Sequence, residues 1–145
     1  MILVIGGYAQ GQLDYVRATY KVREQDIYSG QMPSQVRDTP RDRDVNPVFA
    51  RQSTEHGETW IVIDKFNEWA IRELHAGREP MDAIRRLIER YPNCILISDE
   101  IGNGIVPVEE SARNIRDAVG GLQVKMAEQA DEVIRVICGL GQKIK

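Results

Sequence analysis

The stretch VIGGYAQGQLDYV, residues 4–16, decides the fold. An apolar run passes into a glycine turn and then into a helical pattern, which is how a phosphate-binding loop begins. Gly6 and Gly11 stand at the spacing of the motif G-x-x-x-x-G-K-[ST], and the next two positions are Gln12 and Leu13. The stretch therefore predicts a strand, a loop and a helix whose loop lacks two of the motif's residues.

Each missing residue has a definite task in such a loop. Backbone N–H groups surround the phosphates, the lysine adds a positive charge, and the hydroxyl group ligates Mg²⁺. Gln12 has no charge and Leu13 cannot ligate a metal ion, although glycine turns of this kind also occur for packing reasons alone. The candidate phosphate-binding residues are Gly6, Gly7, Gly11, Gln12 and Leu13. We predict that binding of ATP or GTP is weak or absent and needs no Mg²⁺.

Short apolar runs and amphipathic stretches alternate along the rest of the chain. The runs rich in Ile and Val are the predicted strands, at residues 2–5, 60–63, 94–97 and 133–138. Helical spacing of apolar residues predicts helices over residues 66–74, 81–91 and 112–126. We expect a kink or a break at Gly120 and Gly121, and Arg135 indicates an edge strand or a face that reaches solvent. The alternation predicts one α/β domain over residues 1–145, with three layers and a mostly parallel sheet.

Composition excludes several classes of protein. The chain has 145 residues, of which 42% are apolar and 28% charged, with a net charge of −3, so it offers no broad basic surface to nucleic acid or to an anionic membrane. No apolar run reaches the roughly 18 residues that span a bilayer, and we expect a cytoplasmic protein. Cys94 and Cys138 each lie in an apolar run without metal-ligand spacing, and we predict that both are small core residues.

Residues 30–58 interrupt the alternating pattern. This segment contains three prolines, the charge-dense sequence RDTPRDRD and few large apolar residues, so we predict a mobile surface loop. His56 lies within the segment, whereas His75 lies near the end of a predicted helix, where it interacts with the helix dipole. No Ser-His-Asp arrangement is present in the pattern, so the catalytic residues are unknown and His56 is the one candidate.

Acidic residues follow two of the predicted strands. Asp64 directly follows the run WIVI, and Asp99 and Glu100 follow CILIS. Open α/β sheets bind their ligands at the carboxyl ends of parallel strands, and carboxylates there can hold Mg²⁺ directly or through water. These three acids are the candidate metal ligands. The alternative, that they merely end strands, stays open.

The C-terminal third has the pattern of a known family. The matching residues are Glu100, Gly102, GIVP at 104–107, Arg113, RD at 116–117, Gly120, ADEV at 130–133, Gly139 and Lys145. Over residues 95–145 the chain resembles, without a gap, the bifunctional adenosylcobinamide kinase/adenosylcobinamide-phosphate guanylyltransferase family. The opening MILVIGG is similar to the start of that family, and WIVIDKFNEWAIREL takes the place of its middle strand and helix.

The resemblance implies a P-loop, RecA-like fold and a role in cobalamin biosynthesis. Family members use ATP or GTP with Mg²⁺ to phosphorylate the corrinoid's aminopropanol hydroxyl, transfer GMP through a guanylylated histidine, and form homo-oligomers. This chain departs from the pattern, because the family's Lys and Ser are Gln12 and Leu13 here and its Asn before Glu100 is Asp99. The family's paired histidines are absent, and His56 does not align with them.

Three hypotheses remain. The first is a divergent relative with impaired or lost catalysis that keeps a nucleotide- or corrinoid-binding role, and the second is an active enzyme with a replacement cation. The third is a structural or assembly protein with no ligand. The candidate cations are Arg17, Lys21, Arg37, Arg41 and Arg43. Because Arg17 lies about 7.5 Å along the helix from Gln12, it would have to fold back past the helix start, and we favour the first hypothesis.

Overall fold

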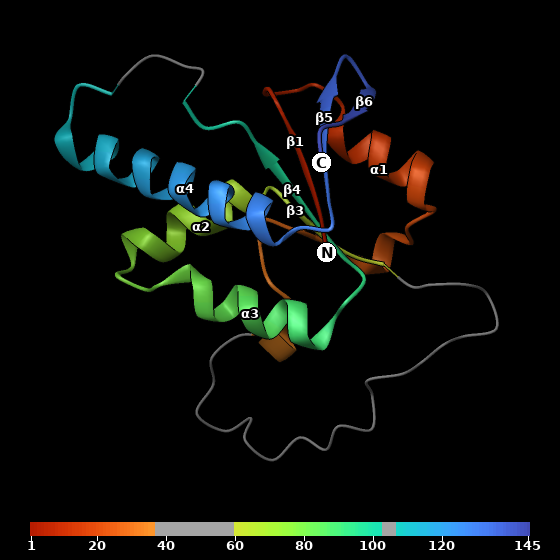
Figure 1. Cartoon of the computed structure of the whole chain (residues 1–145). Coiled ribbons are helices and arrows are strands. Elements are labelled where there is room, and N and C mark those ends of the chain that lie inside the picture. Colours follow the sequence, from red (N-terminus) through yellow and green to blue (C-terminus); the bar gives the residue numbers. More distant parts are fainter. Residues whose placement is uncertain (37–59, 103–106) are drawn as a thin grey trace.

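The computed structural model describes residues 1–36, 60–102 and 107–145 (Figure 1). The strands are β1 (Ile2–Gly6), β2 (Ile27–Ser29), β3 (Ile61–Asp64), β4 (Cys94–Asp99), β5 (Glu132–Ile137) and β6 (Leu140–Lys143). The helices are α1 (Gln12–Tyr20), α2 (Phe66–His75), α3 (Pro80–Arg90) and α4 (Glu110–Gln129), with the short 3₁₀ turns η1 (Glu24–Asp26) and η2 (Ser34–Val36). The predicted α/β class is confirmed.

The strands form one sheet in the order β2-β3-β4-β1-β5-β6. All neighbouring strands are parallel except β5 and β6, which are antiparallel. The register pairs Gly6, at the end of β1, with Asp99 of β4 and with Val136 of β5. The loop after β1 therefore begins beside the end of β4, as the parallel arrangement requires.

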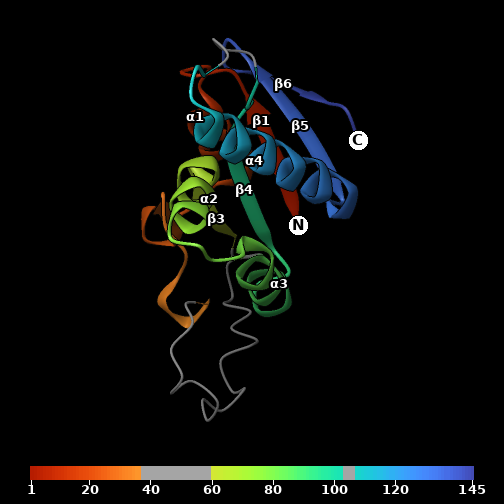
Figure 2. The same ribbon diagram turned by 90° about the vertical axis from the view of Figure 1, so that its left-hand side faces the viewer.

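Helices cover both faces of the sheet and give three layers. In Figure 1, α1 lies on one side of the strands and α2, α3 and α4 lie on the other, and in Figure 2 these three helices lie in front of the sheet. On the α1 side, Val16 packs with Val4 and Ile95, and all three are fully buried. On the opposite side, Phe66 of α2 and Leu122 of α4 belong to one apolar cluster with residues of the sheet. The apolar strand runs are thus buried on both faces, which is why they lack polar alternation.

The sequence pattern did not predict two of the strands, β2 and β6. β2 has only three residues, and every residue of β6 is exposed, so neither strand shows an apolar run. Because β6 pairs with β5, the run at residues 133–138 is not an edge strand, and that alternative is wrong. The other alternative is confirmed, since Arg135 reaches solvent.

The expected break at Gly120 and Gly121 is also wrong. One helix, α4, runs through both glycines from Glu110 to Gln129. Each glycine costs a helix interior about 1 kcal/mol relative to alanine. Burial of Val119, Leu122 and Met126 against the sheet outweighs that cost.

The two cysteines have different environments. Cys94 is fully buried in β4, as predicted, and burial raises the pKa of its thiol to about 11. Cys138 is exposed, so its assignment to the core is wrong. It has φ +50° and precedes Gly139 at φ +77° in the two-residue turn between Ile137 and Leu140. Hairpin turns of two residues favour positive φ at both positions, and this geometry places Cys138 outside the strand.

Only the first part of the expected loop at residues 30–58 is described. Residues 34–36 form η2, and Met32 and Val36 are buried in the core, so the prediction of a surface loop is wrong for this first part. Arg86 of α3 donates a hydrogen bond from Nε to the carbonyl oxygen of Val36 at 3.3 Å. Residues 37–58, which include His56, lie outside the described residues.

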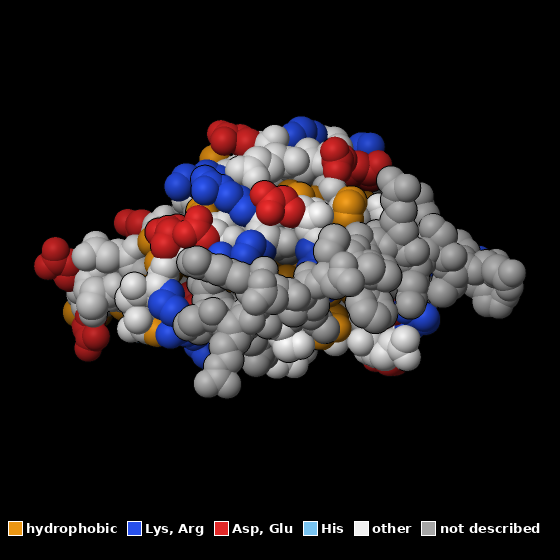
Figure 3. All heavy atoms as spheres, turned by 90° about the horizontal axis from the view of Figure 1, so that it is seen from below, with side chains coloured by type: hydrophobic (Ala, Val, Ile, Leu, Met, Phe, Trp, Pro, Cys, Tyr) orange, Lys and Arg blue, Asp and Glu red, His pale blue; other side chains and the backbone are white. Residues whose placement is uncertain are grey.

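The described surface agrees with the near-neutral composition. On the face in Figure 3, Lys and Arg side chains are interspersed with Asp and Glu side chains. Within residues 1–36, 60–102 and 107–145, no helix is both long and apolar enough to cross a membrane.

Candidate functional site

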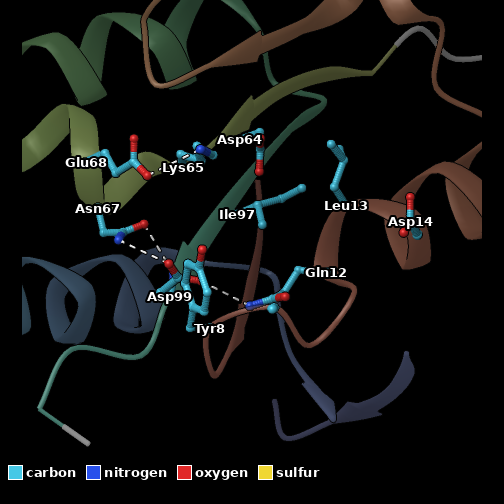
Figure 4. Close-up of a pocket in the computed structure, with 11 residues that line it drawn as sticks. Tyr8, Gln12, Leu13, Asp14, Asp64, Lys65, Asn67, Glu68, Ile97 and Asp99 are labelled. Carbon is cyan, nitrogen blue, oxygen red and sulfur yellow. Dashed lines mark hydrogen bonds and ion pairs between the residues drawn. The ribbon is translucent and has the colours of Figure 1, made fainter. Parts of the chain in front are cut away.

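A cleft of about 280 Å³ lies at the carboxyl ends of β1, β3 and β4 (Figure 4). It is lined by Tyr8, Ala9, Gln12, Leu13, Asp14, Asp64, Lys65, Asn67, Glu68, Ile97 and Asp99. The loop after β1 and the start of α1 form one wall, and the start of α2 forms the other. This is the edge at which open parallel sheets bind their ligands.

The glycines of the loop shape it without lining the cleft. Gly6 ends β1, where a Cβ atom would lie 2.6 Å from the carbonyl oxygen of Val136. Gly11 is the N-cap of α1 with φ +83°, a conformation that favours glycine. Of the five candidate phosphate-binding residues, only Gln12 and Leu13 line the cleft.

The C-terminal hairpin holds the tip of this loop. The Gln10 carbonyl oxygen accepts a hydrogen bond from the Gly139 N–H at 2.8 Å. The Oε1 atom of Gln10 accepts a second one from the Cys138 N–H, also at 2.8 Å. A Cβ on Gly11 would approach within 3.4 Å of the Cα of Gly139. The loop and the turn between β5 and β6 are therefore packed as a unit.

Gln12 takes the place of the motif's lysine and has a buried side chain, with 7% of the residue exposed. Its Nε2 atom donates to the carbonyl oxygen of Gly7 at 2.8 Å and to Oδ1 of Asp99 at 3.3 Å. The amide thus bridges the loop and the end of β4. A neutral donor occupies this position, so the loop offers an incoming phosphate no charge from this side chain.

Asp99 is hydrogen-bonded on both carboxylate oxygens. Besides the Gln12 contact, its Oδ2 lies 3.5 Å from Nδ2 of Asn67, and its backbone N–H donates to Oδ1 of Asn67 at 3.2 Å. Burial raises the pKa of Asp99 above its ordinary value, the Asn67 hydrogen bond opposes that rise, and the charges of Glu68 and Asp64 add to it. Each carboxylate oxygen of Asp99 therefore accepts one hydrogen bond from a neighbouring amide in the cleft wall.

Of the other two candidate metal ligands, Asp64 lines the cleft and Glu100 does not. Asp64 is 9% exposed, and its Oδ2 accepts a hydrogen bond from Ser29 Oγ at 3.0 Å. Glu100 instead forms a two-point ion pair with Arg135, at 2.6 and 3.0 Å. Within the described ranges, no group of three or more His, Cys, Asp and Glu side chains is arranged to hold a metal ion.

Lys65 is a residue of the cleft that the sequence analysis missed. It follows Asp64 directly and is the N-cap of α2, with φ +53°. Its Nζ lies 3.4 Å from Oε1 of Glu68, and both side chains are about half exposed. Its position next to a strand-end acid was the signal that could have identified it, because such positions face the ligand edge of the sheet.

The candidate replacement cations that were named from the sequence either lie outside the cleft or lie outside the described residues. Arg17 forms ion pairs with Glu24 at 2.9 Å and Asp14 at 3.4 Å, and Lys21 ends α1 as its C-cap. Neither lines the cleft. The arginines at positions 37, 41 and 43 lie outside the described residues, as does His56. His75 is the last residue of α2, as predicted.

Comparison with known proteins agrees with this architecture. The family model for cobinamide kinase / cobinamide phosphate guanyltransferase matches residues 33–144, so the loop after β1 precedes the matched region. The bifunctional adenosylcobalamin biosynthesis protein CobU of Salmonella typhimurium is 41% identical over 68 residues, which are 44% of this chain and 38% of that protein. Its namesake in Escherichia coli is 39% identical over 84 residues, which are 54% of this chain and 45% of that protein.

The matches thus span less than half the length of either relative. The family model, in contrast, covers most of this chain and includes every described element from η2 to β6. The chain belongs to the cobinamide kinase / cobinamide phosphate guanyltransferase family.

Proposed function

We propose that this protein is a divergent member of its family that acts in cobalamin biosynthesis as a corrinoid-binding protein and has lost phosphoryl and nucleotidyl transfer. The family match supports the corrinoid, because the family is described by its action on cobinamide. The cleft at the carboxyl ends of β1, β3 and β4 supports a small-molecule site. The structural role without a ligand has no comparable support.

One observation is the main reason to propose lost transfer. The side chain that stands in the lysine position is the neutral amide of Gln12, and both of its N–H donors are engaged, by Gly7 and Asp99. The adjacent Leu13 has no oxygen for a metal ion. Phosphoryl transfer depends on positioning and on stabilisation of charge around the phosphates. This loop provides neither of the two side chains that supply that stabilisation.

The charges of the cleft favour a corrinoid over a nucleoside triphosphate. The acids that line it are Asp14, Asp64, Glu68 and Asp99, against the single cation Lys65 among the described lining residues. A triphosphate brings several negative charges close to these carboxylates, which is unfavourable where water is partly excluded. The corrinoid's aminopropanol hydroxyl is neutral, and carboxylate and amide oxygens are suitable acceptors for it.

A second candidate is an active kinase with a replacement cation. The observation that favours it is the position of Lys65 in the cleft, on the wall opposite the loop. In that case Lys65, not Arg17 or Lys21, supplies the missing positive charge. Turnover distinguishes this candidate from the first, because binding alone is compatible with both.

The test combines corrinoid binding with a transfer assay on the full chain. Cobinamide binding is measured by calorimetry for the natural protein and for Tyr8→Ala, because Tyr8 lines the cleft and is 87% exposed. Val124→Ala, at an exposed position on α4, is the matched control. We expect saturable binding that Tyr8→Ala weakens and Val124→Ala leaves unchanged.

The transfer assay follows labelled phosphate from ATP and GTP, and labelled GMP from GTP, onto cobinamide and cobinamide phosphate. We expect no product above the reaction without protein. Turnover that depends on the protein would show that transfer is retained and would favour the second candidate. Absence of cobinamide binding would contradict the corrinoid role.

A further inference from the structure

Gln10 differs from its neighbours in the loop after β1 because it does not line the cleft. Four residues around it do, namely Tyr8, Ala9, Gln12 and Leu13. The side chain of Gln10 instead reaches the turn between β5 and β6, where its Oε1 atom accepts a hydrogen bond from the Cys138 N–H at 2.8 Å. Gln10 therefore lies between two parts of the cleft wall without being part of the wall itself.

The backbone of Gln10 binds the same turn. Its carbonyl oxygen accepts a hydrogen bond from the next N–H along the chain, that of Gly139, at 2.8 Å. Figure 1 shows the β5–β6 hairpin beside the start of α1. One loop residue thus binds two successive N–H groups of the turn, so that neither the loop tip nor the turn can shift alone without breaking a hydrogen bond.

Close packing extends this contact along α1. A Cβ atom on Gly11 would approach within 3.4 Å of the Cα atom of Gly139, and a Cβ atom on Gly141 would overlap the ring of Tyr15. The absence of a side chain at Gly141 lets α1 lie against the hairpin. The loop tip is therefore held from the hairpin side by packing as well as by hydrogen bonds.

The backbone on each side of the contact is strained. Ala9 has φ +58° and Cys138 has φ +50°, values that residues with a Cβ atom rarely adopt. Such conformations persist where the surrounding contacts hold them. Tyr8, the residue before Ala9, is 87% exposed, so burial does not fix this part of the wall. The hydrogen bonds of Gln10, the residue after Ala9, therefore hold the strained conformation.

We propose that Gln10 is a positioning residue, which holds the Tyr8–Ala9 wall of the cleft in place through the turn of the C-terminal hairpin. A ligand then meets a wall that is already ordered, and its affinity is higher because binding does not have to order the loop. The inference rests on the proposed function in one respect, that this cleft binds a small molecule. It goes further because it gives the hairpin, 128 residues away along the chain, an influence on that binding.

The test compares three variants of the full chain with the natural protein. Gln10→Met removes the acceptor oxygen at similar length, and Gln10→Glu keeps an acceptor oxygen. Gln142→Met, at an exposed position on β6, is the matched control. Without ligand, NMR measures the order parameters of the Tyr8 and Ala9 N–H groups and the hydrogen exchange of the Gly139 amide. Calorimetry then measures cobinamide binding.

We expect Gln10→Met to lower the order parameter of the Ala9 N–H from about 0.85 to about 0.6, the difference between a rigid and a flexible backbone. The Gly139 amide should exchange about threefold faster, although its own acceptor is unchanged, and cobinamide affinity should fall about threefold. The melting temperature should fall by only about 2 °C, because water replaces the lost bond at this exposed position. Gln10→Glu and Gln142→Met should behave as the natural protein.

Unchanged order at Tyr8 and Ala9 in Gln10→Met would overturn the inference, as would an equal loss of order in Gln142→Met. Loss of order with unchanged cobinamide affinity would overturn the influence of the hairpin on binding. The failure of the proposed function gives a different result, because the natural protein itself would then not bind cobinamide. In that case the order parameters, which are measured without ligand, still decide whether Gln10 positions the wall.

Discussion

The Nε2 atom of Gln12 lies 3.3 Å from Oδ1 of Asp99, so that an amide joins the start of α1 to the end of β4. The same nitrogen donates to the carbonyl oxygen of Gly7 at 2.8 Å. This arrangement fixes the loop by hydrogen bonds between its own residues and the sheet. These hydrogen bonds hold the turn, although the lysine of the motif is absent.

The contact predicts the effect of removing the amide. Gln12→Met keeps a similar volume but leaves the Gly7 carbonyl and the Asp99 carboxylate without this donor. We expect the free energy of unfolding to fall by about 1–3 kcal/mol, the usual cost of an unsatisfied buried polar group. Urea unfolding at neutral pH measures the change. A loss below the experimental error would show that the contact does not stabilise the loop.

The raised pKa of Asp99 predicts that the stability of the fold depends on pH. Burial raises the pKa of its carboxyl in the folded protein, so the folded chain binds this proton up to a higher pH than the unfolded chain does. Between the ordinary aspartate pKa and the raised value, the contribution of this group to the free energy of unfolding therefore decreases as the pH rises.

Titration of the Asp99 carboxyl by NMR, with unfolding measured across the same pH range, checks this prediction. Asp99→Asn should lack the slope, whereas Asp82→Asn, at an exposed position on α3, should keep it. A folded-state pKa at or below the ordinary aspartate value would contradict the prediction.

Two glycines form a matched pair with opposite expected effects. At Gly6 an added Cβ meets the Val136 carbonyl oxygen at 2.6 Å, and backbone cannot move aside easily. We expect Gly6→Ala to destabilise the fold by about 1–3 kcal/mol. At Gly121, in the interior of α4, nothing lies within 4 Å of the added atom. Gly121→Ala should stabilise by about 0.5–1 kcal/mol, and thermal unfolding of both variants measures the difference.

The sequence predicted the layers of the fold better than the details of the candidate site. Continuous apolar runs identified β1, β3, β4 and β5 because parallel strands are buried on both faces. β6 was missed because its residues Leu140–Lys143 are all exposed and it is held by pairing with β5. Propensity alone could not show that burial along α4 outweighs Gly120 and Gly121.

The residues of the candidate site were also predicted only in part from the sequence. Asp64 and Asp99 were placed at the cleft because strand ends meet at one edge of a parallel sheet. Glu100 follows the same strand, but its partner Arg135 comes from β5, a pairing that only the sheet order reveals. Lys65 was missed because its place in the cleft depends on a left-handed backbone at φ +53°, and its position beside the strand-end acid Asp64 was the one signal for it.

That backbone conformation leads to a prediction on stability. A lysine in the left-handed region is strained, whereas asparagine tolerates it. We expect Lys65→Asn to raise the free energy of unfolding by about 0.5 kcal/mol, since it also removes only a weak ion pair. Chemical denaturation of this variant beside Lys125→Asn measures the gain. A clear loss of stability would show that the lysine side chain stabilises the fold despite its backbone conformation.

We infer that the loop after β1 has kept its turn and lost the charge of the motif's lysine. The most direct measurement is a calorimetric titration of ATP and GTP, with and without Mg²⁺, into the natural protein and into the double variant Gln12→Lys, Leu13→Ser. We predict weak or no binding and no Mg²⁺ dependence for the natural protein, and a clear gain of Mg²⁺-dependent affinity for the double variant. Submicromolar, Mg²⁺-dependent binding by the natural protein would contradict the claim.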